Sequence, residues 1–123
     1  MEENNKIIAE FMGFTFEKNI GYYDNEMLLE QIVYEQQNGN CFDELLFNKD
    51  WNWLMAVVEK IESLGGAVCI GNGNCVMIIF YLTDVMGESY SKTRELIGET
   101  KIESVYNACV EFIEWYNENK SHL

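Results

Sequence analysis

The clearest hydrophobic pattern of the chain lies near its C-terminus and predicts a helix over about residues 100–118. Apolar side chains recur there at helical spacing and define one face: Ile102, Val105, Tyr106, Cys109, Phe112, Ile113 and Tyr116. Polar side chains define the opposite face: Glu103, Asn107, Glu111, Glu114 and Glu118. The segment Thr100-Lys101-Ile102-Glu103 forms a capping box, in which the threonine hydroxyl and the glutamate carboxylate satisfy orphan amide groups.

A second amphipathic helix is predicted over about residues 51–64, with Asp50 suited to cap it and Gly65-Gly66 suited to end it. The predicted buried stripe comprises Trp51, Leu54, Val58, Ile61 and either Val57 or Leu64. Trp51 and Trp53 point about 200° apart on a helix, so one of them at most lies fully in the core. We expect Trp51 to pack and Trp53 to lie at the rim; the alternative is that Trp53 is an exposed anchor for a partner.

A β-hairpin is predicted between these helices, over about residues 67–82. Two apolar segments flank Gly71-Asn72-Gly73-Asn74, and a central Asn-Gly pair is a strong hairpin signal. A two-residue turn would pair Ile70 with Cys75, and would place Cys69 and Cys75 on opposite faces of the sheet. The second strand, residues 75–82, is apolar on both faces, which predicts a central strand covered on each side.

The N-terminal part of the chain gives shorter patterns. A short amphipathic helix is predicted over residues 5–12, with Gly13 as its end, and a short strand is expected to begin at Phe14. Residues 21–24 are expected to form a turn.

The remaining segments are less distinctive. Residues 25–40 have both helical spacing and a strand-like composition, and we favour a helix. Residues 41–47 are expected to connect elements and to cover the core with apolar side chains, and residues 86–90 to form a loop. Residues 92–97 fit either a third strand or a short helical turn. The pattern as a whole predicts a single acidic α+β domain over residues 1–123, with a small antiparallel sheet packed by two long helices and a short N-terminal helix.

Charge changes this picture most. The chain has 21 acidic and 8 basic residues among 123, which gives a formal net charge of −13. Such a surface repels nucleic acid and anionic membranes and attracts basic protein surfaces. No apolar run approaches the ~20 residues that span a bilayer, and the acidic N-terminus is unlike a signal peptide. We therefore expect a cytoplasmic protein that binds neither nucleic acid nor membranes directly.

Catalytic and metal-binding patterns are missing from the sequence. The four cysteines, Cys41, Cys69, Cys75 and Cys109, include no Cys-x-x-Cys pair, and the one histidine is His122, near the C-terminus. We expect reduced, mostly buried thiols, no zinc site and no Cys–His catalytic pair. The glycine-rich segments lack the residues of a phosphate loop. The sequence thus predicts a protein that is not an enzyme and has no cofactor.

The candidate site is a partner-binding surface. Its predicted residues are Glu103, Glu111, Glu114, Glu118, Trp53 and Trp115. Glutamates one helical turn apart are separated by roughly 5–6 Å, close to the spacing of phosphates along a nucleic-acid strand. The alternative interpretation is an ordinary solvated helix face.

Two blocks of the sequence, DWNWLMAVVEKIESL at residues 50–64 and KIESVYNACVEFIEWYN at residues 101–117, resemble small uncharacterised proteins of phages, prophages and mobile elements of Bacteroidota. Residues 7–13 fit the same resemblance. It implies a viral or mobile-element origin and implies no reaction.

The combined expectation is a non-enzymatic acidic binding protein of phage type. Its expected partner is a basic host protein, such as a nuclease of host defence, which it would inhibit in the manner of an anti-CRISPR protein by acting on a nucleic-acid-handling surface. The alternative is a phage structural or housekeeping accessory protein that forms a homodimer through apolar faces. Salt dependence separates the two, because electrostatic capture weakens with ionic strength and apolar association does not.

Overall fold

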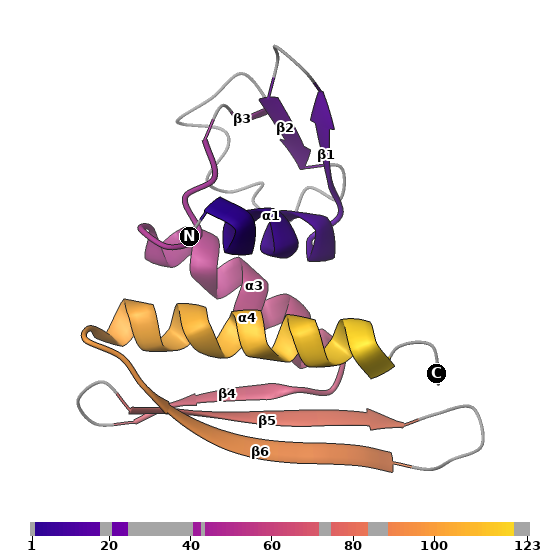
Figure 1. Ribbon diagram of the computed structural model, residues 1–123, viewed down its shortest axis with the longest axis vertical. Helices are drawn as coiled ribbons and strands as arrows, with labels where there is room; N and C mark the ends of the chain where they lie inside the picture. Colours follow the sequence, from indigo (N-terminus) through magenta and orange to yellow (C-terminus); the bar gives the residue numbers. More distant parts are fainter. Residues whose placement is uncertain are drawn as a thin grey trace. The chain divides into compact units, whose positions relative to one another are not determined.

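The chain folds into helices and antiparallel strands, and the predicted α+β class is confirmed. The computed structural model describes residues 2–17, 21–24, 41–42, 44–71, 75–83 and 89–119 (Figure 1). The elements follow in the order α1 (Glu2–Phe11), β1 (Phe14–Glu17), β2 (Gly21–Asp24), β3 (Cys41–Phe42), α3 (Trp51–Ser63), β4 (Ala67–Ile70), β5 (Cys75–Thr83), β6 (Ser89–Ile97) and α4 (Lys101–Asn119). They form two compact units, residues 1–57 and 58–123, with the boundary inside α3. The single domain over residues 1–123 stays a prediction.

The first unit contains α1 and a sheet of strand order β1-β2-β3. The predicted N-terminal helix is confirmed, although it begins already at Glu2, and Gly13 follows it with a left-handed φ of 82°. Residues 21–24 were predicted as a turn, and this is wrong: they form β2, which pairs with β1 from Phe14↔Asp24 to Glu17↔Gly21. The two tyrosines of this segment favour an extended backbone, because aromatic side chains fit the pleated surface of a sheet.

The core of the first unit joins α1, the connection before α3 and the start of α3. Its buried apolar residues are Ile8, Ala9, Met12, Leu45, Phe47, Trp53, Leu54 and Val57. Asn5 is buried as well, and its Nδ2 donates hydrogen bonds to the Leu45 carbonyl (3.4 Å) and to Asn48 Oδ1 (3.1 Å). The expectation that residues 41–47 cover the core is confirmed for Leu45 and Phe47, whereas Cys41–Phe42 forms β3.

The two tryptophans of α3 have the reverse of their predicted places. Trp53 is 1% exposed, and Trp51 is 39% exposed. The Trp53 ring packs edge-on against Phe47, with centroids 5.1 Å apart, and lies 6.5 Å from Phe14. Helical periodicity alone could not choose between the tryptophans, because the choice depends on these two aromatic rings, which come from outside the helix.

The second unit packs α4 against the sheet of strand order β4-β5-β6 (Figure 1). Gly65, with φ 98°, ends α3 as predicted. Gly66 is closely surrounded, because a Cβ there would lie 2.6 Å from Phe112 Cε2 and 2.7 Å from Ile61 Cγ2. The end of α3 and the middle of α4 therefore meet at this glycine, with Val58 and Ile61 buried.

The predicted hairpin is confirmed, and β5 is the central strand, but the register differs by one residue. The structure pairs Ile70 with Val76 and Cys69 with Met77, so the predicted two-residue turn is wrong. Residues 72–74, which connect the strands, lie outside the described residues. Since Cys75 is two positions from Met77, the prediction that Cys69 and Cys75 occupy opposite faces is also wrong. Cys69 is an exposed free thiol.

Of the two alternatives for residues 92–97, the strand is confirmed. It belongs to β6, which pairs with β5 from Cys75↔Ile97 to Thr83↔Ser89. The predicted helix over residues 25–40 lies outside the described residues, as do residues 86–88 of the predicted loop, while Ser89 and Tyr90 already belong to β6.

Candidate partner-binding surface

The N-terminus of α4 is fixed by a set of hydrogen bonds. The Glu103 amide donates to Thr100 Oγ1 (3.2 Å), which is the threonine half of the predicted capping box. The buried Ser104 hydroxyl donates to the Thr100 carbonyl (3.0 Å) and accepts the Gly98 amide (2.7 Å). These bonds set the point at which the helix begins, and thereby which of its residues face the sheet.

More of the circumference of α4 is buried than the sequence pattern predicted. The buried residues are Ser104, Val105, Tyr106, Ala108, Cys109, Val110, Phe112 and Ile113. The reason is that α4 meets the sheet, while Phe112 also meets the end of α3 beside Gly66. Consequently Glu103 and Glu111, predicted on a solvated face, are half-buried, and Ile102 and Tyr116, predicted in the core, are half-buried too.

Glu114 and Glu118 are the exposed carboxylates of α4. They lie one helical turn apart, about 6 Å along the axis. Within the described part of the chain, neither is in an ion pair. Trp115 stands beside Glu114 and is half-buried, with its ring 6.0 Å from that of Phe112. Two carboxylates without an ion-pair partner among the described residues and an indole ring packed near Phe112 therefore share the last turns of α4.

The structure thus brings together four of the six predicted site residues: Glu111, Glu114, Trp115 and Glu118. Glu103 lies two turns earlier on the same helix. Trp53 belongs to the other unit and is buried in its core, so its side chain does not contribute to a surface. Sequence reasoning missed two exposed aromatic residues in the described part of the chain, Phe16 and Trp51. Trp51 has the equally exposed Met55 one turn further along α3.

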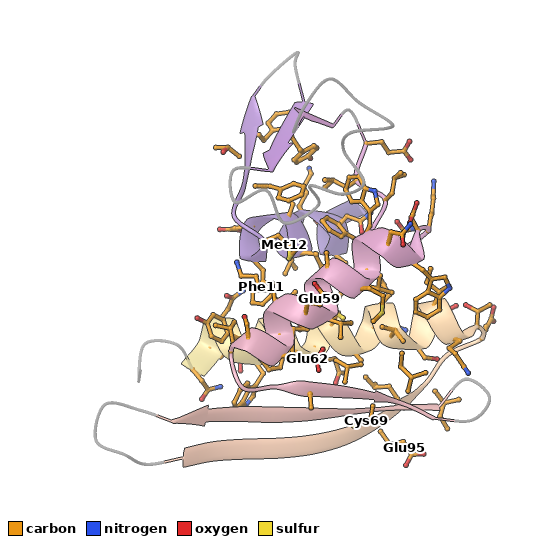
Figure 2. The ribbon with its side chains drawn as sticks, turned by 180° about the vertical axis from the view of Figure 1, so that it is seen from behind. Phe11, Met12, Glu59, Glu62, Cys69 and Glu95 are labelled. Atoms are coloured by element: carbon orange, nitrogen blue, oxygen red, sulfur yellow. The ribbon has the colours of Figure 1, made fainter. Side chains whose placement is uncertain are left out.

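Exposed carboxylates are spread over both units. In the described residues they are Glu3, Glu10, Glu44, Glu59, Glu62, Glu95, Glu99, Glu114 and Glu118, whereas the exposed cationic residues are Lys6, Lys49 and Lys101. Glu59 and Glu62 come from the part of α3 in the second unit (Figure 2). Lys49 is engaged by Glu44, with Nζ and Oε1 3.2 Å apart. The described surface is therefore predominantly negative.

The titratable groups in the core of the second unit are kept neutral by burial. Desolvation raises the pKa of Tyr106 to about 12 and raises the pKa of the Cys109 thiol well above its ordinary range. A cysteine nucleophile needs the opposite shift, because the thiolate is the reactive form. In the described residues, no group of three or more His, Cys, Asp or Glu side chains is arranged to hold a metal ion.

Comparison of the chain with protein-family models, with curated proteins and with solved structures finds no match. Among the described helices, none is long and apolar enough to cross a membrane. The functional interpretation is therefore built from the charge and exposure of the side chains described above.

Proposed function

We propose that the chain is a non-enzymatic acidic binding protein of phage type that inhibits a host defence nuclease by occupying its basic nucleic-acid-handling surface. The observation that carries the proposal is the pair Glu114 and Glu118, exposed one turn apart on α4 without a partner among the described residues. Carboxylates in this state are available for charge-assisted hydrogen bonds with arginine and lysine side chains.

The charge of the whole chain supports the same partner class. A formal charge of −13 destabilises the folded state through self-repulsion, and it accelerates encounter with a positively charged surface. The resemblance of residues 50–64 and 101–117 to proteins of phages and mobile elements supports an origin in which host defence is the opponent.

The proposed mode of action is competition with nucleic acid. Glu114 and Glu118 are separated by about the distance between successive phosphates, so they suit the same arginine and lysine side chains. Trp115 supplies an apolar surface beside them, of the type that is enriched at the centres of interfaces.

The proposed competition between the chain and nucleic acid can be tested directly. The purified chain is immobilised and incubated with bacterial host lysate at low salt, and captured proteins are identified by mass spectrometry. Each captured protein is then purified, and its binding to a fluorescent oligonucleotide is titrated with the chain. The proposal predicts that the chain displaces the oligonucleotide. A specific partner that keeps its oligonucleotide when saturated with the chain would contradict it.

Two double variants with the same net charge test whether the partner binds at the end of α4. The double variant Glu114→Lys, Glu118→Lys should lose displacement. The control variant Glu3→Lys, Glu10→Lys changes the net charge equally but on α1, where both residues are exposed. Equal losses in the two variants would show that only the total charge matters.

A further inference from the structure

An aromatic pair on the sheet of the first unit extends beyond the core of that unit. Phe16 of β1 and Tyr22 of β2 occupy directly opposite positions on these two neighbouring strands (Figure 1). Their ring centroids lie 4.9 Å apart, with an interplanar angle of 52°. Phe16 is 60% exposed and is the most exposed aromatic side chain among the described residues, whereas Tyr22 is half-buried. We refer to Phe16 and Tyr22 as the aromatic pair.

The place of Phe16 along β1 explains why its ring lies outside the core. Phe14 lies two positions earlier in the strand and therefore on the same face of the sheet. The Phe14 ring reaches the core, where it lies 5.8 Å from the ring of Phe47 and 6.5 Å from that of Trp53. The core thus ends at Phe14, and the ring of Phe16 lies against Tyr22 with most of its surface in solvent. Exposed aromatic rings that are gathered, and not scattered singly, are typical of an interaction site.

The pairing register continues the aromatic row to the third strand. Tyr22 is also opposite position 42 of β3, which is a phenylalanine, so the three strands have aromatic residues in one row. Aromatic residues on a sheet or barrel surface stack on nucleic-acid bases in many binding proteins, and those surfaces lie in positively charged grooves that attract the phosphates. The charge around the aromatic pair therefore decides which class of ligand it suits.

The charge around the aromatic pair is negative. Residues 14–24 contain the acidic residues Glu17 and Asp24 and one basic residue, Lys18. The first unit, residues 1–57, contains 11 acidic and 3 basic residues and has a net charge of −8. This charge repels the phosphates of a nucleic acid and attracts a cation. The face of an aromatic ring also attracts a cation, because it carries the negative part of the ring quadrupole.

We propose that the aromatic pair binds an arginine side chain of a protein partner, with the guanidinium group stacked on the exposed side of the Phe16 ring. Arginine suits this site better than lysine, because the guanidinium group is planar, stacks on aromatic rings and is more weakly hydrated than an ammonium group. Tyr22 packs against Phe16 in the free chain, so less side-chain freedom is lost when the ligand binds. The site lies in the first unit and does not depend on the carboxylates of α4.

Two fluorescent peptides of equal charge, hexa-arginine and hexalysine, test the proposal by fluorescence anisotropy with the full chain. Phe16→Leu, which keeps an apolar side chain but removes the ring, should lower the affinity for hexa-arginine by about threefold or more and leave the affinity for hexalysine unchanged. Phe16→Tyr should bind both peptides as the wild type does. The matched control is Trp51→Leu, which removes the other exposed aromatic ring of the first unit and should change neither affinity. Circular dichroism establishes that the variants are folded.

Nuclear magnetic resonance of the wild-type chain provides a second measurement. Hexa-arginine should shift the ring resonances of Phe16 and Tyr22 more than hexalysine does. The proposal is overturned if these resonances stay unchanged, if Phe16→Leu binds hexa-arginine as tightly as the wild type, or if Trp51→Leu loses as much affinity. It is also overturned if the chain binds single-stranded oligothymidylate and Phe16→Leu abolishes that binding, because the aromatic pair then stacks on bases. Glu114→Lys, Glu118→Lys should weaken both peptides alike, so failure at α4 and failure at the aromatic pair are distinguishable.

Discussion

At the scale of single residues, burial separates side chains that the sequence makes look equivalent. Trp51 and Trp53 stand two positions apart on α3, yet one is 39% and the other 1% exposed. The difference arises because the Trp53 ring packs against the rings of Phe47 and Phe14. Trp53, for which the sequence left open the role of an exposed anchor, is therefore part of the core of the first unit.

This contrast gives a first prediction. Trp53→Ala should lower the free energy of unfolding by about 3–5 kcal/mol, because it removes a large buried ring and leaves a cavity. Trp51→Ala should change it by less than about 1 kcal/mol. Urea denaturation followed by far-ultraviolet circular dichroism measures both values. Equal losses in the two variants would contradict the assignment of Trp53 to the core.

Gly98 and Ser104 form a close contact that also depends on single atoms. A Cβ at Gly98 would lie 2.9 Å from Ser104 Oγ and 3.1 Å from the Ser104 amide nitrogen. Gly98→Ala should therefore destabilise the fold by about 1–3 kcal/mol, since a backbone atom cannot move away cheaply. Ser104→Ala should cost a similar amount, because the Gly98 amide loses its acceptor. Thermal unfolding of the two single variants and the double variant measures these costs, and strictly additive losses would contradict a shared contact.

Tyr106 predicts how stability depends on alkaline pH. Burial raises its pKa from 10.0 to about 12, so the unfolded chain releases this proton at lower pH than the folded chain. The stabilisation is complete below pH 10 and is lost as the pH rises from about 10 to 12. Urea midpoints between pH 8 and 12 should fall less steeply in Tyr106→Phe than in the wild type. Tyr116→Phe is the control, and parallel pH profiles for the wild type and Tyr106→Phe would contradict the prediction.

At the scale of elements, the sequence predicted those helices and strands that are determined by local residue patterns. Both long helices, the hairpin and the central place of β5 follow from helical periodicity, capping residues and the Asn-Gly signal. The hairpin register did not follow, because the Gly71-to-Asn74 segment admits loops of more than one length. The sequence pattern also did not predict that residues 21–24 form the strand β2. A strand of four residues is too short for a distinct pattern of its own and is identified by its pairing with β1.

The candidate site shows the same limit. The sequence placed Glu103, Glu111, Glu114 and Glu118 along one side of α4, and the structure keeps them on that helix. Which of them are exposed depends on how far the sheet and the end of α3 reach around α4, and periodicity contains no information on that. Of these four glutamates, Glu114 and Glu118 are exposed, and Glu103 and Glu111 are half-buried.

The cap of α4 provides a prediction at this scale. Thr100→Ala should destabilise the second unit by about 1 kcal/mol, because the Glu103 amide loses its side-chain acceptor. Thr100→Ser, which keeps a hydroxyl, should retain most of the stability. Urea denaturation compares the two variants, and a serine variant as unstable as the alanine variant would point to the lost methyl group instead of the cap.

At the scale of the whole molecule, charge is distributed unevenly. The chain carries −13, the three strands of the second unit carry +1, and exposed carboxylates are found on both units. Association of the exposed carboxylates with a basic partner should weaken as the salt concentration rises. A basic partner would bind the acidic residues of α4.

The central claim is that Glu114 and Glu118 engage a basic partner. The most direct measurement is the association rate of the chain with its captured partner as a function of ionic strength. We expect the wild-type rate to fall steeply with salt. The rate for Glu114→Lys, Glu118→Lys should be at least several-fold lower at low salt, with a shallower slope than that of Glu3→Lys, Glu10→Lys. If the two double variants have the same rates and slopes, the claim is contradicted, and this part of α4 is only a solvated helix face.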